Sequence, residues 1–190
     1  MMFFKLITLL LPFIGYAIYE INQLEVDPID FSCHYRKQIK GDLKSLFPFL
    51  TSPYVLEKLL PWLTRFNETD KRIISPGKSY TAVIIIPILG ERRIYATLTN
   101  YKPLKLMAFE FSNDYVKQKI IIQMCNYHDR SLLQTTIYFQ QTSLIYQYTI
   151  GYILRSVIRK KLEKSTKNLA TMIGSLIGTE TIPHFARKPI

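Results

Sequence analysis

The stretch that decides the fold is SYTAVIIIPILGERRIYATLTNYKPLKLMAFEFS, residues 79–112. It contains three runs of β-branched and aromatic residues, which favour strands, and these runs are separated by Gly90-Glu91 and Lys102-Pro103, which favour turns. Three further runs of the same kind are residues 71–74, 116–127 and 131–141. Because turn signals recur at intervals of roughly 8–14 residues, the pattern predicts one antiparallel sheet.

One more strand and two short helices are predicted before the sheet region. Residues 31–40 (FSCHYRKQIK) alternate roughly between apolar and polar side chains, which is typical of a strand. Asp42 is a good N-cap for a helix over residues 42–50. Ser52-Pro53 begins a second helix, which is predicted to end near Pro61-Trp62.

A long amphipathic helix is predicted after the sheet, over residues 143–177. Its apolar residues recur at helical spacing and form one stripe, while the basic residues of the segment lie off that stripe. The stripe consists of Ile150, Leu154, Ile158, Leu162, Leu169, Ile173 and Leu176, widened by Ile153, Val157 and Met172. Residues 179–190 are predicted to form a tail.

The N-terminal residues 1–19, MMFFKLITLLLPFIGYAIY, predict delivery to a membrane compartment. One positive charge, Lys5, precedes an apolar run, and both a signal peptide cleaved after Ala17 and an uncleaved membrane anchor fit the segment. A buried N-terminal helix is the third interpretation. Residues 20–28 are acidic and are predicted to form a linker to a single domain over residues 29–178.

The charge and length of the chain narrow the classes of partner. The 190 residues fit one domain, and we expect a monomer. The net charge of +11 is scattered along the chain, which fits either a solvated surface or contact with an anionic membrane. Nucleic acid is not an expected partner, because the aromatic residues interleave with apolar residues and not with basic ones.

The order of the predicted elements resembles the START-like superfamily, also called the Bet v 1-like or polyketide cyclase and lipid-transport group. The resemblance covers residues 30–177. It rests on residues 53–62 (PYVLEKLLPW), 100–106 (NYKPLKL) and 159–172 (RKKLEKSTKNLATM). It implies an α+β helix-grip fold: a curved antiparallel sheet of about seven strands, two short helices after strand 1, and a long C-terminal helix over the sheet.

The resemblance also implies a cavity between the sheet and the long helix. Members of the superfamily carry lipids, sterols, hormones or quinones there, and some catalyse cyclisations or hydrations. Strand alternation makes the inward side chains almost all apolar, so the matching ligand is an apolar small molecule or lipid. The predicted pocket residues are Trp62 at the mouth, Tyr80, Ile84, Ile94, Leu98, Phe109, Phe111, Ile120, Ile122, Ile137, Phe139, Tyr146, Ile150, Ile153 and Val157.

Signals for catalysis and for metal binding are poor. Cys33 and His34 are neighbours on a predicted strand, so they face opposite sides and cannot form a dyad. Cys125 and His128 would supply only two of the four ligands that a structural zinc needs. The carboxylate of Glu110 is expected to face solvent. We therefore predict no catalytic residue, no metal and no cofactor.

The two cysteines are predicted to be free. Cys33 lies on the first strand and Cys125 on a later strand, with the last strand expected between them. Two strand spacings are about 9–10 Å, beyond the limit of about 7 Å between the Cα atoms of a disulfide. Two mostly buried thiols are the expected result.

Three functions remain open at this point: a carrier of an apolar ligand, a cyclase-type or hydratase-type enzyme, and a scaffold with a solid core. The expected location is a membrane of the secretory pathway, or the secreted fraction. Asn67-Glu68-Thr69 is a glycosylation sequon, so Asn67 is a predicted glycan site if the domain is lumenal.

Overall fold

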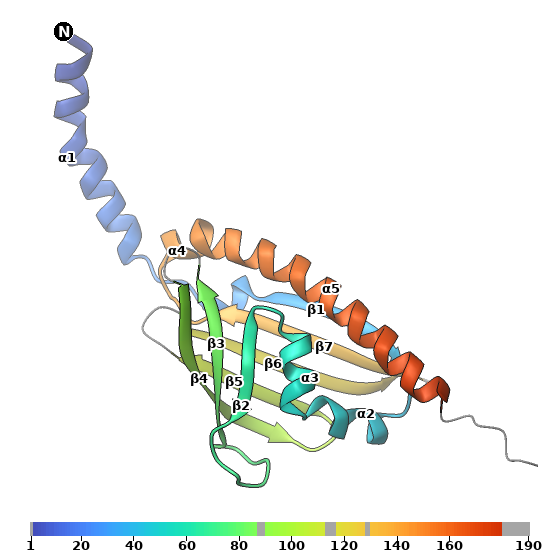
Figure 1. Cartoon of the computed structure of the whole chain (residues 1–190). Helices are drawn as coiled ribbons and strands as arrows, with labels where there is room; N and C mark the ends of the chain where they lie inside the picture. Colours follow the sequence, from blue (N-terminus) through green and yellow to red (C-terminus); the bar gives the residue numbers. More distant parts are fainter. Residues whose placement is uncertain (1, 87–89, 113–116, 128–129, 180–190) are drawn as a thin grey trace, which may run out of the picture.

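The structure, a computed structural model, describes residues 2–86, 90–112, 117–127 and 130–179. It contains a seven-stranded antiparallel sheet in the order β1-β7-β6-β5-β4-β3-β2, with two short helices after the first strand and a long C-terminal helix over the sheet (Figure 1). The predicted α+β helix-grip architecture is therefore confirmed. Residues 180–190 of the predicted tail lie outside the described residues.

The strands are β1 (Cys33–Lys40), β2 (Leu63–Glu68), β3 (Ser79–Ile86), β4 (Gly90–Lys102), β5 (Leu106–Ser112), β6 (Lys117–Tyr127) and β7 (Arg130–Phe139). The helices are α1 (Met2–Gln23), the 3-10 helix η1 (Pro28–Phe31), α2 (Leu43–Leu50), α3 (Pro53–Leu59), α4 (Leu144–Tyr148) and α5 (Ile150–Thr179). The side chain of Asp42 accepts a hydrogen bond from the Lys44 backbone N–H, as its predicted N-cap role requires.

The sheet owes its buried face to strict alternation along the strands. On β4, Ile94, Ala96 and Leu98 are buried, whereas Tyr95 between them is 58% exposed. The register then aligns apolar residues of neighbouring strands in a row, which consists of Leu98, Phe109, Ile120, Ile137 and Cys33. Such cross-strand neighbours on one face stabilise the sheet.

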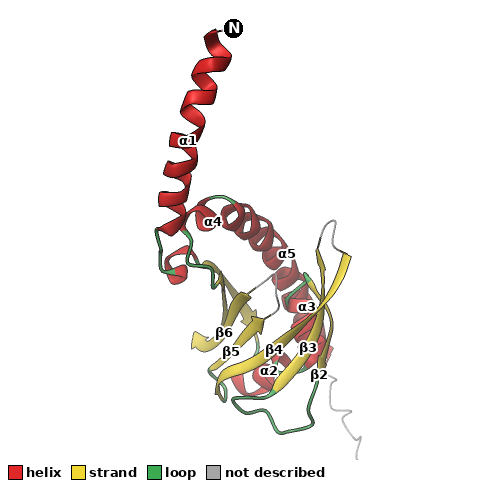
Figure 2. Cartoon of the chain, turned by 90° about the vertical axis from the view of Figure 1, so that its left-hand side faces the viewer, coloured by secondary structure: helices red, strands yellow, loops and turns green. Residues whose placement is uncertain are grey.

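Helices cover this concave face and complete the core. The side of α3 that carries Val55, Leu56 and Leu59 is buried. Helix α5 packs against β1 and α3 and buries a stripe at helical spacing, formed by Ile158, Leu162, Leu169 and Ile173. Figure 2 shows the helices on one side of the curved sheet, which leaves the opposite face open.

The predicted strand at residues 71–74 is wrong, because those residues lie in a loop and the strand is β2. The loop is held by Arg72, whose guanidinium donates to an Asp70 carboxylate oxygen at 2.7 Å and to the Gly77 carbonyl at 3.0 Å. In β2 the pairing register shifts at Arg65, which has a φ of 52°. This bulge spaces the buried Leu63 and Phe66 three residues apart and so hides the strand from a period-2 reading.

The predicted single helix over residues 143–177 is divided in two. Helix α4 ends at Thr149, whose backbone leaves the helical region, and α5 begins at once. Gly151 permits this close approach, because a Cβ there would lie 3.0 Å from the Tyr146 carbonyl oxygen. The two helices therefore meet at a sharp junction next to the sheet.

Helix α1 projects away from the rest of the chain (Figure 1). It continues to Gln23, so the first four residues of the predicted linker, 20–23, are helical. Where its side chains are described they are exposed, with Leu9 at 68% and Phe13 at 70%, so the interpretation as a buried helix is wrong. Among the described residues, no helix is both long enough and apolar enough to cross a membrane.

The base of α1 is joined to the start of α4. The Ser143 hydroxyl donates to the Asn22 side-chain oxygen at 2.9 Å. Two backbone bonds follow, from the Val26 N–H to the Thr142 carbonyl at 2.8 Å and from the Leu144 N–H to the Leu24 carbonyl at 3.0 Å. These bonds fix the point at which α1 leaves the body, beside α4.

Candidate functional site

The concave face of the sheet places most of the predicted pocket residues side by side. Nine of the predicted residues are at most 4% exposed: Tyr80, Ile94, Leu98, Phe109, Phe111, Ile120, Ile122, Ile137 and Phe139. Trp62, Ile84 and Tyr146 are half-buried and pack against the same core. The alternation used in the prediction is therefore right on β3 to β7. Contact of these residues with a ligand stays a prediction.

The predicted orientation of the long helix is wrong. Ile150, Ile153 and Val157 are 56%, 63% and 46% exposed and do not line the interior. At 3.6 residues per turn, Ile153 lies about 180° around the helix from the fully buried Leu162. The apolar residues of the first half of α5 therefore occupy two faces of the helix. Only the face that continues through Leu162 and Leu169 packs against the sheet.

Aromatic rings fill the part of the concave face near β2. The ring of Phe66 stacks on Tyr80 with 5.1 Å between centroids and meets Phe109 edge-on at 6.1 Å. Phe109 also meets Tyr80 at 5.7 Å and Phe111 at 6.3 Å. Burial raises the pKa of Tyr80 to about 12, with smaller contributions from nearby acidic groups. The sequence did not identify Phe66, because it lies on the bulged strand.

Two polar side chains interrupt the apolar lining on β6 and β7. Gln118 and Thr135 are each 1% exposed, and both have the parity of their buried apolar neighbours. The Gln118 Nε2 and Thr135 Oγ1 atoms have no hydrogen-bond partner among the described residues. Leaving such a group buried and unpaired costs about 1–3 kcal/mol. These two atoms are therefore suited to hydrogen bonds with a group that the chain itself does not supply.

Gln118 lies beneath the α4 end of the sheet. Its register partner on β7 is Phe139, whose ring meets Tyr146 of α4 edge-on at 6.3 Å. Burial raises the pKa of the Tyr146 hydroxyl, and the nearby Arg155 opposes this shift. Strand alternation alone would have identified Gln118, since it precedes Ile120 by two residues.

Arg155 fixes the junction between α4 and α5. Its guanidinium donates to the Gln147 side-chain oxygen and to the Gln147 carbonyl, both at 2.6 Å, and it lies 5.2 Å from the centre of the Phe31 ring. Gln147 is fully buried and donates to the Gln141 carbonyl at 2.6 Å. Burial is the main cause that lowers the pKa of Arg155. Arg155 thus provides hydrogen bonds to the two buried acceptors of Gln147 at the α4 end of the sheet.

A polar hollow of about 400 Å³ lies along the seam between β1 and the first half of α5. Within it the Ser32 Oγ and His34 Nε2 atoms lie 2.6 Å apart, and the His34 Nδ1 and Thr136 Oγ1 atoms lie 3.0 Å apart. The lining residues are Ser32, Cys33, His34, Tyr152, Arg155, Ser156 and Arg159. Apart from Cys33, these residues belong to none of the sets predicted from the sequence.

The chemistry of the hollow does not resemble a nucleophilic site. Cys33 is buried and His34 is exposed, so the two neighbours face opposite sides as expected. Burial raises the pKa of the Cys33 thiol, although Arg159 and Arg155 partly oppose the shift. A thiolate is the reactive form of cysteine, so this shift makes Cys33 a poor nucleophile.

The other candidate groups lie apart from one another. Glu110 points to the open face of the sheet, as predicted, and pairs with Lys119 at 2.9 Å. Cys33 and Cys125 are both free, with β7 between their strands, but Cys125 is exposed and the prediction of its burial is wrong. Among the described residues, no three His, Cys, Asp or Glu side chains lie close enough to hold a metal ion.

The two thiols are therefore expected to differ in reactivity. In the native chain an alkylating reagent at neutral pH should modify Cys125 rapidly and Cys33 only after unfolding, as peptide mass spectrometry would show. Burial favours the neutral thiol of Cys33, so this contribution to stability is present below its ordinary pKa and is lost as the pH rises through the raised value. Equal labelling of both thiols in the folded chain would contradict the burial of Cys33.

The fold is shared with solved structures of low sequence identity. Protein TTHA0849 from Thermus thermophilus is 9% identical with a TM-score of 0.59, over 76% of this chain and 98% of that chain. Protein DR_A0006 from Deinococcus radiodurans is 11% identical with a TM-score of 0.57, over 74% and 95%. Protein Ms6760 from Mycobacterium smegmatis is 11% identical with a TM-score of 0.56, over 80% and 97%.

No protein-family model and no curated protein matches the chain. The structural likenesses nevertheless show the fold, which is the START-like, or Bet v 1-like, helix-grip fold expected from the sequence. This fold is compatible with binding a small ligand between the sheet and the long helix. Function must be argued from the site, since one fold hosts many functions.

Proposed function

We propose that this chain binds a mostly apolar small molecule, such as a lipid, on the concave face of the sheet beneath α4 and the start of α5. The observation that carries the proposal is the pair of orphaned polar atoms, Gln118 Nε2 and Thr135 Oγ1, within an otherwise apolar lining. A ligand with a large apolar body and one or two hydrogen-bonding groups matches both features.

The ligand reaches this face by movement of the α4–α5 junction. The interior is closed, because its lining side chains are almost fully buried. The junction has a break at Thr149, and the outer residues of the first turns of α5 make little contact with the sheet. Two hydrogen bonds from Arg155 to Gln147 hold the junction shut, so their release opens the path above Gln118.

Removing one orphaned polar atom should separate stability from binding. Thr135→Val replaces the buried hydroxyl by a methyl group of the same shape. The free energy of unfolding without ligand should stay equal or rise, by up to about 1–3 kcal/mol, because an unpaired polar group is removed. Uptake of the ligand should weaken by about threefold to tenfold, the value of one hydrogen bond. Native mass spectrometry and chemical denaturation give the two readouts.

The matched control is Thr97→Val, on the exposed side of β4. This change should leave both ligand uptake and the interior unaltered. Unchanged uptake in Thr135→Val would contradict the proposed position of the ligand. A lower stability of ligand-free Thr135→Val would show instead that the hydroxyl has a stabilising partner, such as a buried water.

Helix α1 is proposed to attach the chain to a membrane. Helix α1 has 22 residues and projects from the body, so its apolar surface is free to lie against a bilayer. Its side chains from Leu9 to Tyr19 are exposed, which is costly for so apolar a helix in water. On this proposal the body lies at a membrane of the secretory pathway, where the exposed Asn67 of β2 is available for glycosylation if the body is lumenal.

A further inference from the structure

The first half of α5, together with α4, presents large apolar side chains to solvent. Four such residues, which we call the docking face, are Tyr148 (65% exposed), Ile150 (56%), Ile153 (63%) and Val157 (46%). Ile150, Ile153 and Val157 are three or four residues apart and so lie together on one side of the helix. A contiguous exposed apolar patch marks an interaction surface more often than a bare surface.

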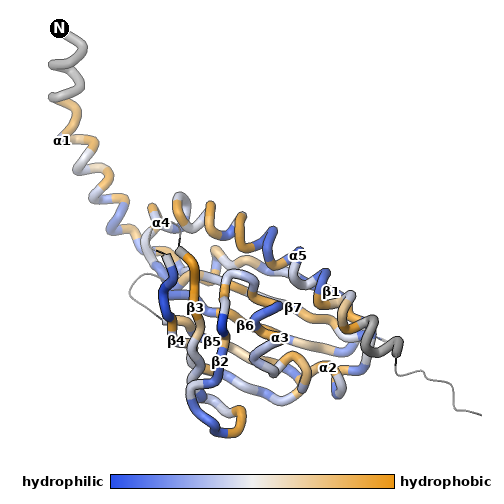
Figure 3. Tube along the Cα trace, viewed as in Figure 1, coloured by the Kyte–Doolittle hydropathy of each residue, from blue (hydrophilic) through white to orange (hydrophobic). Residues whose placement is uncertain are grey.

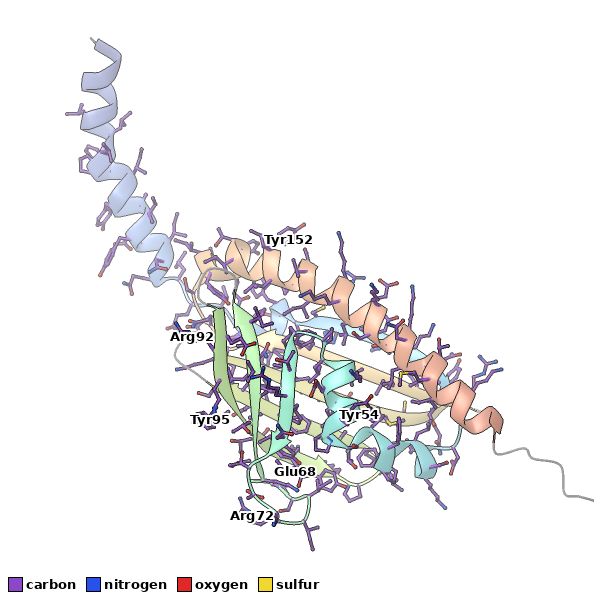
Figure 4. The ribbon with its side chains drawn as sticks, in the orientation of Figure 1. Tyr54, Glu68, Arg72, Arg92, Tyr95 and Tyr152 are labelled. Carbon is purple, nitrogen blue, oxygen red and sulfur yellow. The ribbon has the colours of Figure 1, made fainter. Side chains whose placement is uncertain are left out.

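The docking face lies on the same side of the body as the point where α1 leaves it. Figures 1 and 2 show α1 rising from beside α4, with α5 running across the top of the sheet directly below. In Figure 3 hydrophobic colour marks parts of α1 and the first turns of α5, with hydrophilic residues at the end of α1 between them. Tyr95 lies on β4, away from α5 (Figure 4), whereas Tyr152 lies on the edge of α5 that borders the hollow against β1.

Basic residues follow the docking face directly along α5. Lys160, Lys161 and Lys164 are all exposed and lie on the side of α5 that carries Ile153 and Val157. A helix with apolar and aromatic residues on one part of its outer side and Lys or Arg around them is typical of helices that lie in the interface of a bilayer. The positive charges fit the anionic headgroups of phosphatidylserine or phosphatidylinositol lipids.

We propose that the docking face lies against an anionic bilayer, beside the point where α1 attaches to it. The four apolar side chains then reach the boundary between headgroups and acyl chains, and the three lysines meet the lipid phosphates. This inference rests on the proposed membrane attachment by α1. The inference defines how the attached body is oriented: the α4–α5 junction faces the lipid. This junction is also the proposed path to the interior.

The test uses the full-length chain reconstituted into vesicles containing brominated lipid, which quenches nearby tryptophan. Ile153→Trp reports on the docking face, and Tyr95→Trp, at a residue of similar exposure, is the matched control. Emission of Trp62, the one tryptophan of the chain, is measured in the unsubstituted protein and subtracted. Vesicles of phosphatidylcholine alone are compared with vesicles that also contain phosphatidylserine.

We expect Ile153→Trp to be strongly quenched in the phosphatidylserine vesicles and less in phosphatidylcholine, while Tyr95→Trp is unquenched in both. Each of Lys160→Gln, Lys161→Gln and Lys164→Gln should lower the ratio of docked to undocked chain by about fivefold. A chain that floats with vesicles but shows equal quenching at both positions overturns the docking and leaves the attachment by α1 intact.

Two other outcomes also overturn the proposal. A chain that stays in the soluble fraction shows that α1 does not attach it, and the docking fails with the attachment. The second outcome is a dimer in detergent that becomes a monomer in Ile153→Asp. This result would show that the docking face binds a second copy of the chain. Ligand uptake is measured separately, so none of these outcomes bears on the interior site.

Discussion

Replacing Phe109 by alanine is expected to lower the free energy of unfolding by about 3–5 kcal/mol, the usual cost of removing a fully buried phenylalanine side chain. Phe109 is 1% exposed and its ring meets those of Phe66, Tyr80 and Phe111. It also lies in the cross-strand row, between Leu98 and Ile120. Its removal therefore leaves a void among residues on five strands, β2 to β6.

Chemical denaturation followed by circular dichroism measures this loss. The matched control is Tyr95→Ala on the opposite face of β4, where a change should stay within about 0.5 kcal/mol. A loss below about 1 kcal/mol in Phe109→Ala would mean that the aromatic cluster is not packed as described. An apolar ligand that restores part of the lost stability would show that the void is accessible from outside.

The second large effect is expected at Arg155. Arg155→Met keeps the length of the side chain but removes both hydrogen bonds to Gln147, which leaves two buried acceptors unpaired. Bonds to a charged group are worth about 1.5–3 kcal/mol each, but Arg155 is only partly buried, so we expect the two bonds together to contribute about 2–4 kcal/mol, less than their sum. The Phe31 ring also loses its cation.

The same denaturation measurement applies, with Arg159→Met as the control. Arg159 lies one turn further along α5 and is exposed, so its replacement should change the stability little. The α4–α5 junction should also loosen in Arg155→Met, and hydrogen exchange of residues 144–157 should accelerate. Equal stability of the two variants would exclude Arg155 as the residue that holds the junction shut.

The sequence was sufficient to predict the architecture because each level of the pattern agreed with the others. Alternation was correct on β3 to β7, where one face of the sheet is buried and a slip of one residue would expose the core. Met124 on β6 is buried, so alternation along the strand predicts that the next residue, Cys125, is exposed, as the structure shows. The burial of Cys125 was predicted wrongly because burial was assigned to the whole strand, whereas only one face of the strand is buried.

The remaining errors have local causes. The strand β2 was missed because its bulge at Arg65 breaks the period of two. The orientation of α5 was missed because its first half is apolar on both sides, so the helical period alone cannot tell the core face from the docking face. The break at Thr149 depends on the approach of Gly151 to Tyr146, a tertiary contact that spacing does not encode.

The site was partly predictable for the same reason. Inward parity identified the apolar lining, and Thr135 shares that parity, but the sequence gives no sign that its hydroxyl lacks a partner. Hydrogen-bond satisfaction depends on the three-dimensional surroundings of a group. The hollow between β1 and α5 likewise joins segments distant in the sequence, and the Arg155–Gln147 bonds depend on the break between α4 and α5.

Native mass spectrometry of the full-length chain, released from detergent micelles after incubation with a mixture of lipids and sterols, tests the binding proposal most directly. The account predicts an added mass close to one apolar molecule per chain, with lower occupancy in Thr135→Val than in Thr97→Val. A bare chain mass under all conditions would contradict ligand binding and would favour a scaffold with a solid core.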